Sequence, residues 1–216
     1  MTDSKPPAPA PQDTGADDRA LAELAIALIA SRVSVAPKRL AAPGPTRAQL
    51  DELLSAAAAA PDHGTLTPWR FVEVGEAARA DLAAVFEAAL VDRDPSVGEI
   101  ERGKAREKAF RAPLLLLAVA RLGPDAPEVP AVDRLVSLGA ALQNLLLAAH
   151  ALGYGAMLTS GRSMASAVLH RAFGLGAQEQ AVCFVSVGTP IRAAGARERP
   201  SPASLLSRWR PPERDA

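Results

Sequence analysis

The sequence predicts a layered domain of helices and strands, in the α/β or α+β class. Segments whose apolar residues recur at helical spacing alternate with short apolar segments bounded by glycine and proline. The apolar content is mostly alanine and leucine, and only 4% of residues are aromatic, a composition that favours helices over an all-β fold. The 216 residues suit one domain, and no internal repeat is visible.

Helical periodicity identifies most of the elements. Thr46 precedes the second helical segment and Gln49 follows three positions later, which is the capping-box pattern. The proline at position 61 ends this helix. The segment from Ala131 to Leu152 is the longest and is apolar nearly all round, so we expect it in the centre of the fold. Helices are expected at residues 18–32, 47–60, 76–91, within 92–112, 131–152 and 163–174.

Four short segments are strand candidates. The sequence WRFVEVG alternates in character and begins at Trp69, which we expect to pack at the strand entry. The run APLLLLAVA is continuously apolar, which indicates a strand buried on both faces. The strands are expected at residues 69–75, 112–120, 154–158 and 179–188, and the proline-rich segment 34–45 is expected to be a connection.

Charge and cysteine content exclude several kinds of partner. Lys plus Arg equals Asp plus Glu at 24 each, so neither a nucleic-acid partner nor a membrane surface is predicted. Cys183 is the single cysteine, which rules out a disulfide within the chain and favours a reducing, cytoplasmic compartment. The charge-free stretch 135–161 is long enough to cross a membrane, but it contains Gln143, Asn144 and His150, so a buried core helix is expected.

The domain organisation follows from composition. Residues 1–17 are polar and proline-rich without the apolar core of a signal peptide, and we expect a disordered lead. Residues 18–194 form the expected domain. Residues 195–216 are a C-terminal tail with no clear element.

Few side chains could catalyse difficult chemistry without help. The chain has no GxxxxGK[ST], GxGxxG or GxSxG motif, and its three histidines lack the spacing of metal ligands. We therefore expect no metal site, no catalytic side chain, and chemistry that depends on a bound cofactor.

Three stretches are candidates for binding such a cofactor. Arg32 and Ser34 could hold a phosphate, although a solvated helix end has the same composition. The loop after the second helix contains His63. The stretch 152–163 combines three glycines with Thr159 and Ser160, which suits close approach of a planar ligand or an ordinary tight turn.

Taken in order, these stretches resemble the nitroreductase family of FMN-dependent NAD(P)H oxidoreductases, and in particular its short YdjA-like branch. The resemblance covers most of residues 20–190. The motifs that carry it are Arg32-Val33-Ser34, Pro45-Thr46, Ala60-Pro61-Asp62-His63 with Pro68-Trp69, Phe110-Arg111-Ala112-Pro113-Leu114, Gly153-Tyr154-Gly155-Ala156 and Gly188-Thr189-Pro190.

The resemblance implies an α+β fold, with a central mixed or antiparallel sheet packed by helices. It implies an interlocked homodimer with FMN at the subunit interface. The implied activity is ping-pong hydride transfer from NADH or NADPH to FMN, and then to a nitroaromatic, a quinone or a related small-molecule acceptor.

The resemblance also assigns residues. The implied cofactor-binding residues are Arg32, Val33, Ser34, His63, Leu158, Thr159, Ser160, Arg197 and Arg199, with His63 acting across the dimer interface. The implied nicotinamide-binding segment is Ala148, Ala149, His150, Ala151, Leu152 and Gly153.

Three positions depart from the pattern. Val33, Ala59 and Thr159 stand where related proteins carry basic residues. Either Arg197 and Arg199 replace the lost cations at the phosphate, or FMN affinity is reduced. The second possibility would suit a catalytically silent flavin-binding or ligand-sensing protein. A helical interaction protein without a ligand is a third reading.

Overall fold

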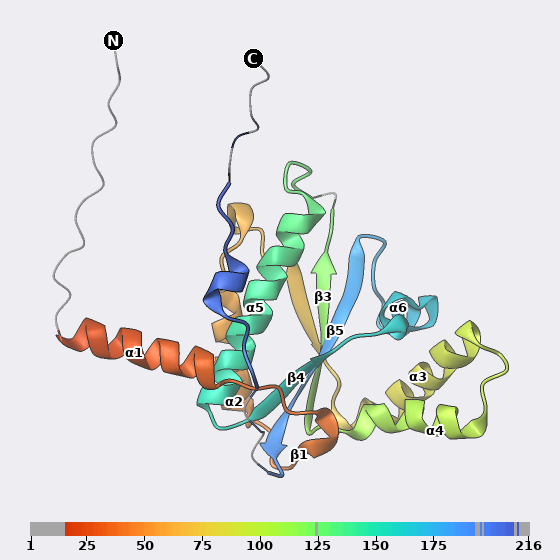
Figure 1. Ribbon diagram of the computed structural model, residues 1–216. Coiled ribbons are helices and arrows are strands. Elements are labelled where there is room, and N and C mark those ends of the chain that lie inside the picture. The colour runs from red at the N-terminus through yellow and green to blue at the C-terminus, as the bar shows by residue number, and fades with distance from the viewer. Residues whose placement is uncertain (1–15, 124, 193–194, 196, 210, 212–216) are drawn as a thin grey trace.

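The computed structural model describes residues 16–123, 125–192, 195, 197–209 and 211. A five-stranded sheet lies between two groups of helices (Figure 1). Every strand pair in it is antiparallel, in the order β1-β5-β3-β2, with β4 also paired to β5. The strands are β1 (Leu40–Ala41), β2 (Trp69–Glu73), β3 (Leu114–Arg121), β4 (Gly155–Thr159) and β5 (Glu179–Pro190).

The helices follow the sequence pattern closely. The capping box forms as predicted: the Thr46 hydroxyl accepts from the Gln49 amide at 3.3 Å, and the Gln49 side chain accepts from the Thr46 amide at 2.9 Å. The helices are α1 (Ala16–Ser31), α2 (Arg47–Ala58), α3 (Arg79–Arg93), α4 (Glu99–Glu107), α5 (Ala131–Ala151) and α6 (Ala167–Ala172). The 3₁₀ turns are η1 (Pro37–Arg39), η2 (His63–Thr65), η3 (Glu76–Ala78), η4 (Lys108–Phe110), η5 (Arg162–Ala165) and η6 (Pro202–Leu205).

The central strand β3 is buried on both faces, as its uninterrupted apolar run predicts. Leu116 and Ala118 pack into the core under α2 and α5, whereas Leu115 and Leu117 pack into a second core with residues of α3 and α6. Trp69 is buried at the entry of β2, which confirms its expected packing role. The sheet therefore separates an α2/α5 face from an α3/α6 face.

One strand and one helix differ from expectation. The segment expected to be only a connection contains β1, whose Leu40 and Ala41 pair with Pro190 and Thr189. Such a short strand has no periodicity in the sequence and forms because β5 offers it an edge. The expected helix over 163–174 is split into η5 and α6, and the Ser166 side chain caps α6 by accepting from the Val168 amide.

Helix α5 is less central than its composition predicts. One side packs in the core through residues such as Leu138 and Leu145, but Val132 and Val136 on the other side are exposed. Among the described helices, α5 alone has the length and apolar composition that would let a helix cross a membrane, a test that the core helix of a globular domain also passes.

The N-terminal helix α1 extends away from the rest of the domain and contacts it mainly through α5 (Figure 1). Four of its large apolar side chains are more than half exposed to solvent, whereas Leu28 is partly buried; the four are Leu21, Leu24, Ile26 and Ile29. Most of the expected disordered lead, residues 1–15, lies outside the described residues. The expected domain boundaries at 18 and 194 stay predictions.

Candidate functional site

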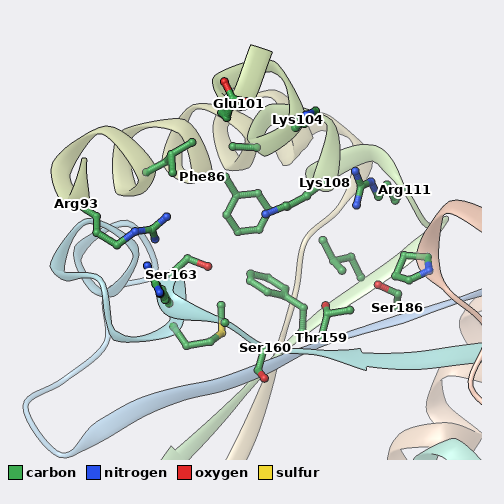
Figure 2. Close-up of a pocket in the computed structure, with 18 residues that line it drawn as sticks. Phe86, Arg93, Glu101, Lys104, Lys108, Arg111, Thr159, Ser160, Ser163 and Ser186 are labelled. Atoms are coloured by element: carbon green, nitrogen blue, oxygen red, sulfur yellow. The ribbon is translucent and has the colours of Figure 1, made fainter. Parts of the chain in front are cut away.

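A cavity of about 620 Å³ opens on the α3/α6 face of the sheet (Figure 2). One wall comes from α3, α4 and η4, and the opposite wall comes from residues 159–164, which follow from the end of β4 into η5. Pro37 reaches it from η1. Its volume lies in the range typical of small-molecule sites.

The floor of the cavity is apolar. Leu115 and Phe184 rise from β3 and β5, and Phe86 faces them from α3. The rings of Phe86 and Phe184 lie edge to face with their centroids 5.4 Å apart. Met164 completes this surface, which suits a flat, conjugated ligand.

The rim of the cavity is strongly basic. Lys104, Lys108 and Arg111 come from α4, η4 and the residue after η4 (Figure 2). Arg93 is the last residue of α3, and Arg162 is the first residue of η5. Among the residues that line the cavity, Glu101 is the one carboxylate.

The acids near this rim are engaged by an arginine that does not line the cavity. Arg106 forms ion pairs with Glu87 at 2.8 Å and with Glu99. The Arg106 guanidinium lowers the pKa of Glu99 through their hydrogen bond. Within the described part of the chain, no carboxylate oxygen lies within 4.0 Å of the charged nitrogens of Arg93, Lys104, Lys108 or Arg162.

Arg111 is the best-anchored cation of the rim. Its Nη2 lies 3.4 Å from the Glu107 carboxylate, and its buried Nε has no hydrogen-bond partner among the described residues. A buried donor without a partner costs free energy, so a ligand acceptor at this position would be stabilising.

Two of the three predicted ligand residues at the end of β4 lie at this cavity. Thr159 and Ser160 line it, whereas the Leu158 side chain packs against the α2/α5 core on the other face of the sheet. Strand alternation separates Leu158 from Thr159, because successive side chains of a strand point to opposite faces, and Ser160 follows after β4 has ended.

The predicted phosphate tripeptide lies along the free edge of β4. Ser34 forms a parallel bridge with Ala156, and the Val35 amide donates to the Ala156 carbonyl at 3.0 Å. The chain then continues to Pro37, the first residue of η1, which lines the cavity. Arg32, Val33 and Ser34 thus lie just upstream of a cavity-lining residue.

The C-terminal tail returns to the same place. The Arg199 guanidinium donates to the Arg32 carbonyl oxygen at 2.7 Å, although 167 positions separate the two residues. Arg197 is exposed two residues earlier. The structure therefore brings the tail arginine to the tripeptide that it was expected to complement.

The glycines near β4 do not all have the expected role. A Cβ at Gly155 would lie 2.9 Å from side-chain carbons of Val35 and Leu40, so this glycine allows the chain to pack on itself rather than on a ligand. Gly161 has a φ of 156° and lines the cavity, where nothing within 4 Å opposes a Cβ.

The remaining predicted residues lie away from the cavity of their own chain. His63 is exposed in η2, and its Nδ1 lies 3.6 Å from the Asp133 carboxylate of α5. Ala59, which follows α2, is also exposed. Their assigned roles stay predictions.

The predicted nicotinamide segment lies at the C-terminal end of α5 and the turn after it. Ala149 is fully buried in the α2/α5 core, and the His150 ring forms a 2.9 Å hydrogen bond with the Ser31 hydroxyl. None of residues 148–153 lines the described cavity. This assignment, too, stays a prediction.

Sequence reasoning missed the cations of α3, α4 and η4. Lys104, Lys108 and Arg111 are spaced i, i+4, i+7, which places them on one helix face. That spacing was present in the charged segment 92–112 and could have identified a basic stripe. Arg93 and Arg162 show no such spacing in the sequence, because they are far apart along the chain and only the fold places them at one cavity.

The fold is an α+β domain with an antiparallel sheet, and its cavity has a volume that suits a small molecule. The chain belongs to the nitroreductase family, whose model matches residues 29–189. This membership confirms the resemblance drawn from the ordered sequence motifs.

Two curated relatives are similar to this chain over most of their own length. The "Putative NAD(P)H nitroreductase" of Haemophilus influenzae is 35% identical over 170 residues, which are 79% of this chain and 90% of the relative. The "Putative NAD(P)H nitroreductase YdjA" of Escherichia coli is 34% identical over 184 residues, which are 85% of this chain and 98% of the relative.

Solved structures share the fold. A nitroreductase-like protein of Bacillus cereus has a TM-score of 0.71 at 20% identity and covers 84% of this chain and 94% of its own. A Desulfovibrio desulfuricans structure, named as a complex with FMN, has a TM-score of 0.65 at 24% identity, with coverages of 87% and 97%. The NADPH:FMN oxidoreductase of Vibrio harveyi has a TM-score of 0.66 at 19% identity, with coverages of 88% and 79%.

Proposed function

We propose that this member of the nitroreductase family is an FMN-dependent NAD(P)H oxidoreductase that reduces small conjugated acceptors, such as nitroaromatics or quinones. The observation that carries the proposal is the cavity with an apolar floor and a basic rim, which Thr159 and Ser160 help to line. The names of the curated relatives and of two structural neighbours, which refer to NAD(P)H or FMN, agree with this cofactor pair.

The residues present fit a flavin mononucleotide. Arg32, Ser34 and Arg199 would hold the phosphate, since Arg199 already contacts the backbone of Arg32 and a guanidinium carries five N–H donors in all. The neighbouring cavity, with its apolar floor, would hold the ring system. The buried Nε of Arg111 offers an unpaired donor at that place.

Bound FMN would supply two-electron transfer between nicotinamide and acceptor. For a nitro group, one NAD(P)H and one proton convert Ar–NO₂ to Ar–NO and water, with NAD(P)⁺ as the other product. The chain's own part is to orient the reactants, to exclude water with its phenylalanine floor and to stabilise negative charge with Lys108 and Arg111. No side chain is assigned as a catalytic acid, so we infer that solvent delivers the proton.

We further propose that the protein is a homodimer. The apolar side chains of α1, together with Val132 and Val136 of α5, are exposed in the single chain and would be buried by a second copy. His63 and residues 148–153 do not line the cavity of their own chain, and a dimer would also allow them to reach the cavity of the partner.

The cytoplasmic location stays a prediction. Cys183 fits it, because burial raises the pKa of this thiol to about 11.

The absorbance spectrum of the purified protein tests the proposal. We expect a yellow protein, either as isolated or after FMN is added, that bleaches without oxygen when NADH or NADPH is added. A nitroaromatic or quinone should then restore the colour. A protein that stays colourless with FMN would overturn the proposal.

The phosphate assignment has its own readout within this experiment. Arg32→Ala should raise the Kd for FMN by about 10-fold or more, because a charge-assisted contact to the phosphate is lost. Arg171→Ala, an exposed arginine on α6 away from the cavity, is the matched control. An unchanged Kd for the Arg32 variant would contradict the assignment.

The lost cations keep a second function open. Thr159 lines the cavity with a hydroxyl group and no charge, and exposed Ala59 has no side-chain donor. A catalytically silent flavin-binding or ligand-sensing protein would bind FMN without bleaching by either nicotinamide. The same spectra therefore decide between the two functions.

A further inference from the structure

We propose that the electron acceptor is a conjugated molecule carrying an anionic group, such as a carboxylate, and that Arg93 and Arg162 bind this group. The inference rests on the proposed oxidoreductase function and names the substrate class of the same site. In Figure 2, Arg93 and Ser163 lie at one end of the cavity, Arg111 lies at the other, and Lys108 lies between them.

The first support is the charge of the cavity. Its lining contains five cationic side chains and one carboxylate, whereas the whole chain has 24 basic and 24 acidic residues. A basic cavity in a chain without net charge attracts anions locally rather than through the overall field of the protein.

The second support is that nearby carboxylates have other partners. Arg106 engages Glu87 and Glu99. Asp94, the residue after Arg93, accepts from the Ser96 hydroxyl at 2.6 Å and from the Ser96 amide at 3.1 Å. Arg93 therefore has no carboxylate within 4.0 Å among the described residues. Its position at the C-terminal end of α3 favours its positive charge.

The third support is the way in which the chain brings the two arginines to one cavity. Arg162 follows Gly161 directly after the residues of β4 that face the cavity, and Ser163 adds a hydroxyl donor beside it. Arg93 arrives from α3 on the opposite wall. Two guanidinium groups and a hydroxyl suit a carboxylate, which accepts several hydrogen bonds in one plane.

The shape of the cavity completes the substrate class. Phe86, Phe184 and Met164 line the same cavity, and an acceptor ring would share it with the flavin ring and lie beside that ring. A nitro-substituted aromatic acid fits this cavity, with its carboxylate at Arg93 and Arg162. In its reduction the carboxylate is unchanged: NAD(P)H supplies two electrons, an N–O bond of the nitro group breaks, and water leaves with two protons, one of which comes from NAD(P)H.

The test compares a charged and a neutral acceptor on the FMN-loaded protein with NADH as donor. The acceptors are 4-nitrobenzoate and its methyl ester. For the variant with both Arg93→Gln and Arg162→Gln, we expect KM for 4-nitrobenzoate to rise by about 10-fold or more, which corresponds to about 1.4 kcal/mol. KM for the ester should change by less than about twofold. Arg171→Gln is the control.

Binding without turnover provides a second measurement. Calorimetric titration of benzoate into the oxidised protein should show weaker binding to the double variant than to the wild type, at equal flavin content. Equal loss with both acceptors, or unchanged benzoate binding, would overturn the inference. A parallel assay with NADPH as donor checks the alternative. If the double variant raises KM for NADPH but not for NADH, the arginines bind the 2′-phosphate of the donor, and the inference is overturned.

Failure of the proposed oxidoreductase function can be distinguished from failure of the anion-site inference. A wild-type protein whose flavin is not reduced by NADH or NADPH refutes the oxidoreductase activity. Benzoate titration of that same protein still decides whether the two arginines bind an anion.

Discussion

Arg70 and Glu179 form the most completely paired ion pair among the described residues. Arg70 Nε and Nη2 donate to the two carboxylate oxygens at 2.6 and 2.9 Å, and the Glu179 side chain is only 16% exposed. The Arg70 hydrogen bonds lower the pKa of Glu179 from 4.5 to about 2. Because Arg70 lies in β2, Glu179 begins β5, and β3 pairs with both strands, the pair ties three strands together.

We expect Glu179→Gln to lower the free energy of unfolding at neutral pH by about 1–2 kcal/mol, since a charge-assisted pair becomes a neutral contact. The folded-state pKa is below the usual value, so the stabilisation is complete above pH 4.5 and is lost as the pH falls toward 2. Urea unfolding between pH 3 and 7 measures the difference, with Glu198→Gln in the exposed tail as control. A difference that is constant with pH would contradict this account.

At the scale of elements, the tail and β4 bring distant parts of the chain to one site. The tail follows β5 and yet passes beside Arg32, where Arg199 contacts the backbone of the tripeptide. This contact supports the proposal that tail arginines replace the cations absent at Val33, Ala59 and Thr159.

Removal of the tail tests its role. Truncation before Gly195 should raise the Kd for FMN by about 10-fold, because Arg197 and Arg199 are lost from the phosphate site. The double variant Arg197→Ala with Arg199→Ala should reproduce the effect, and Arg208→Ala, farther along the tail, should not. Full retention of flavin by the truncated protein would show that the two arginines are only surface charges. Flavin fluorescence titration measures each Kd.

At the scale of the whole molecule, the exposed apolar surface of α1 and α5 is the feature that a single chain leaves unexplained. Val136 is 67% exposed and Ile26 is 66% exposed, on helices that contact each other. A second copy covering both helices would remove this surface from water.

We therefore expect the wild type to sediment with twice the 22.4 kDa mass of one chain. The variant with Ile26→Asp and Val136→Asp should sediment as a monomer and should lose FMN, because burying two carboxylates in an apolar interface is costly. Ala84→Asp on the exposed side of α3 is the control. A monomeric wild type that keeps its flavin would refute the dimer. Analytical ultracentrifugation at matched concentrations gives the masses.

The sequence alone determined most elements and the family. The capping box of α2, the fully buried β3 and the long apolar α5 all follow from local pattern, because periodicity and capping depend on residues close in sequence. The ordered motifs also identified the nitroreductase family, which the match over residues 29–189 confirms.

Only the tertiary structure decided which residues meet. It placed Arg93 and Arg162 at one cavity and Arg199 at Arg32, and it assigned Gly155 to packing against Val35. It also showed why two family motifs go together, since a Cβ at Gly188 would lie 2.7 Å from the ring of Pro113. Local patterns report on neighbours a few residues apart, whereas a ligand site is formed by side chains that β5 and the returning tail bring together across the chain. The sequence thus determined the elements and the chemistry available, and the fold decided which charges face the ligand.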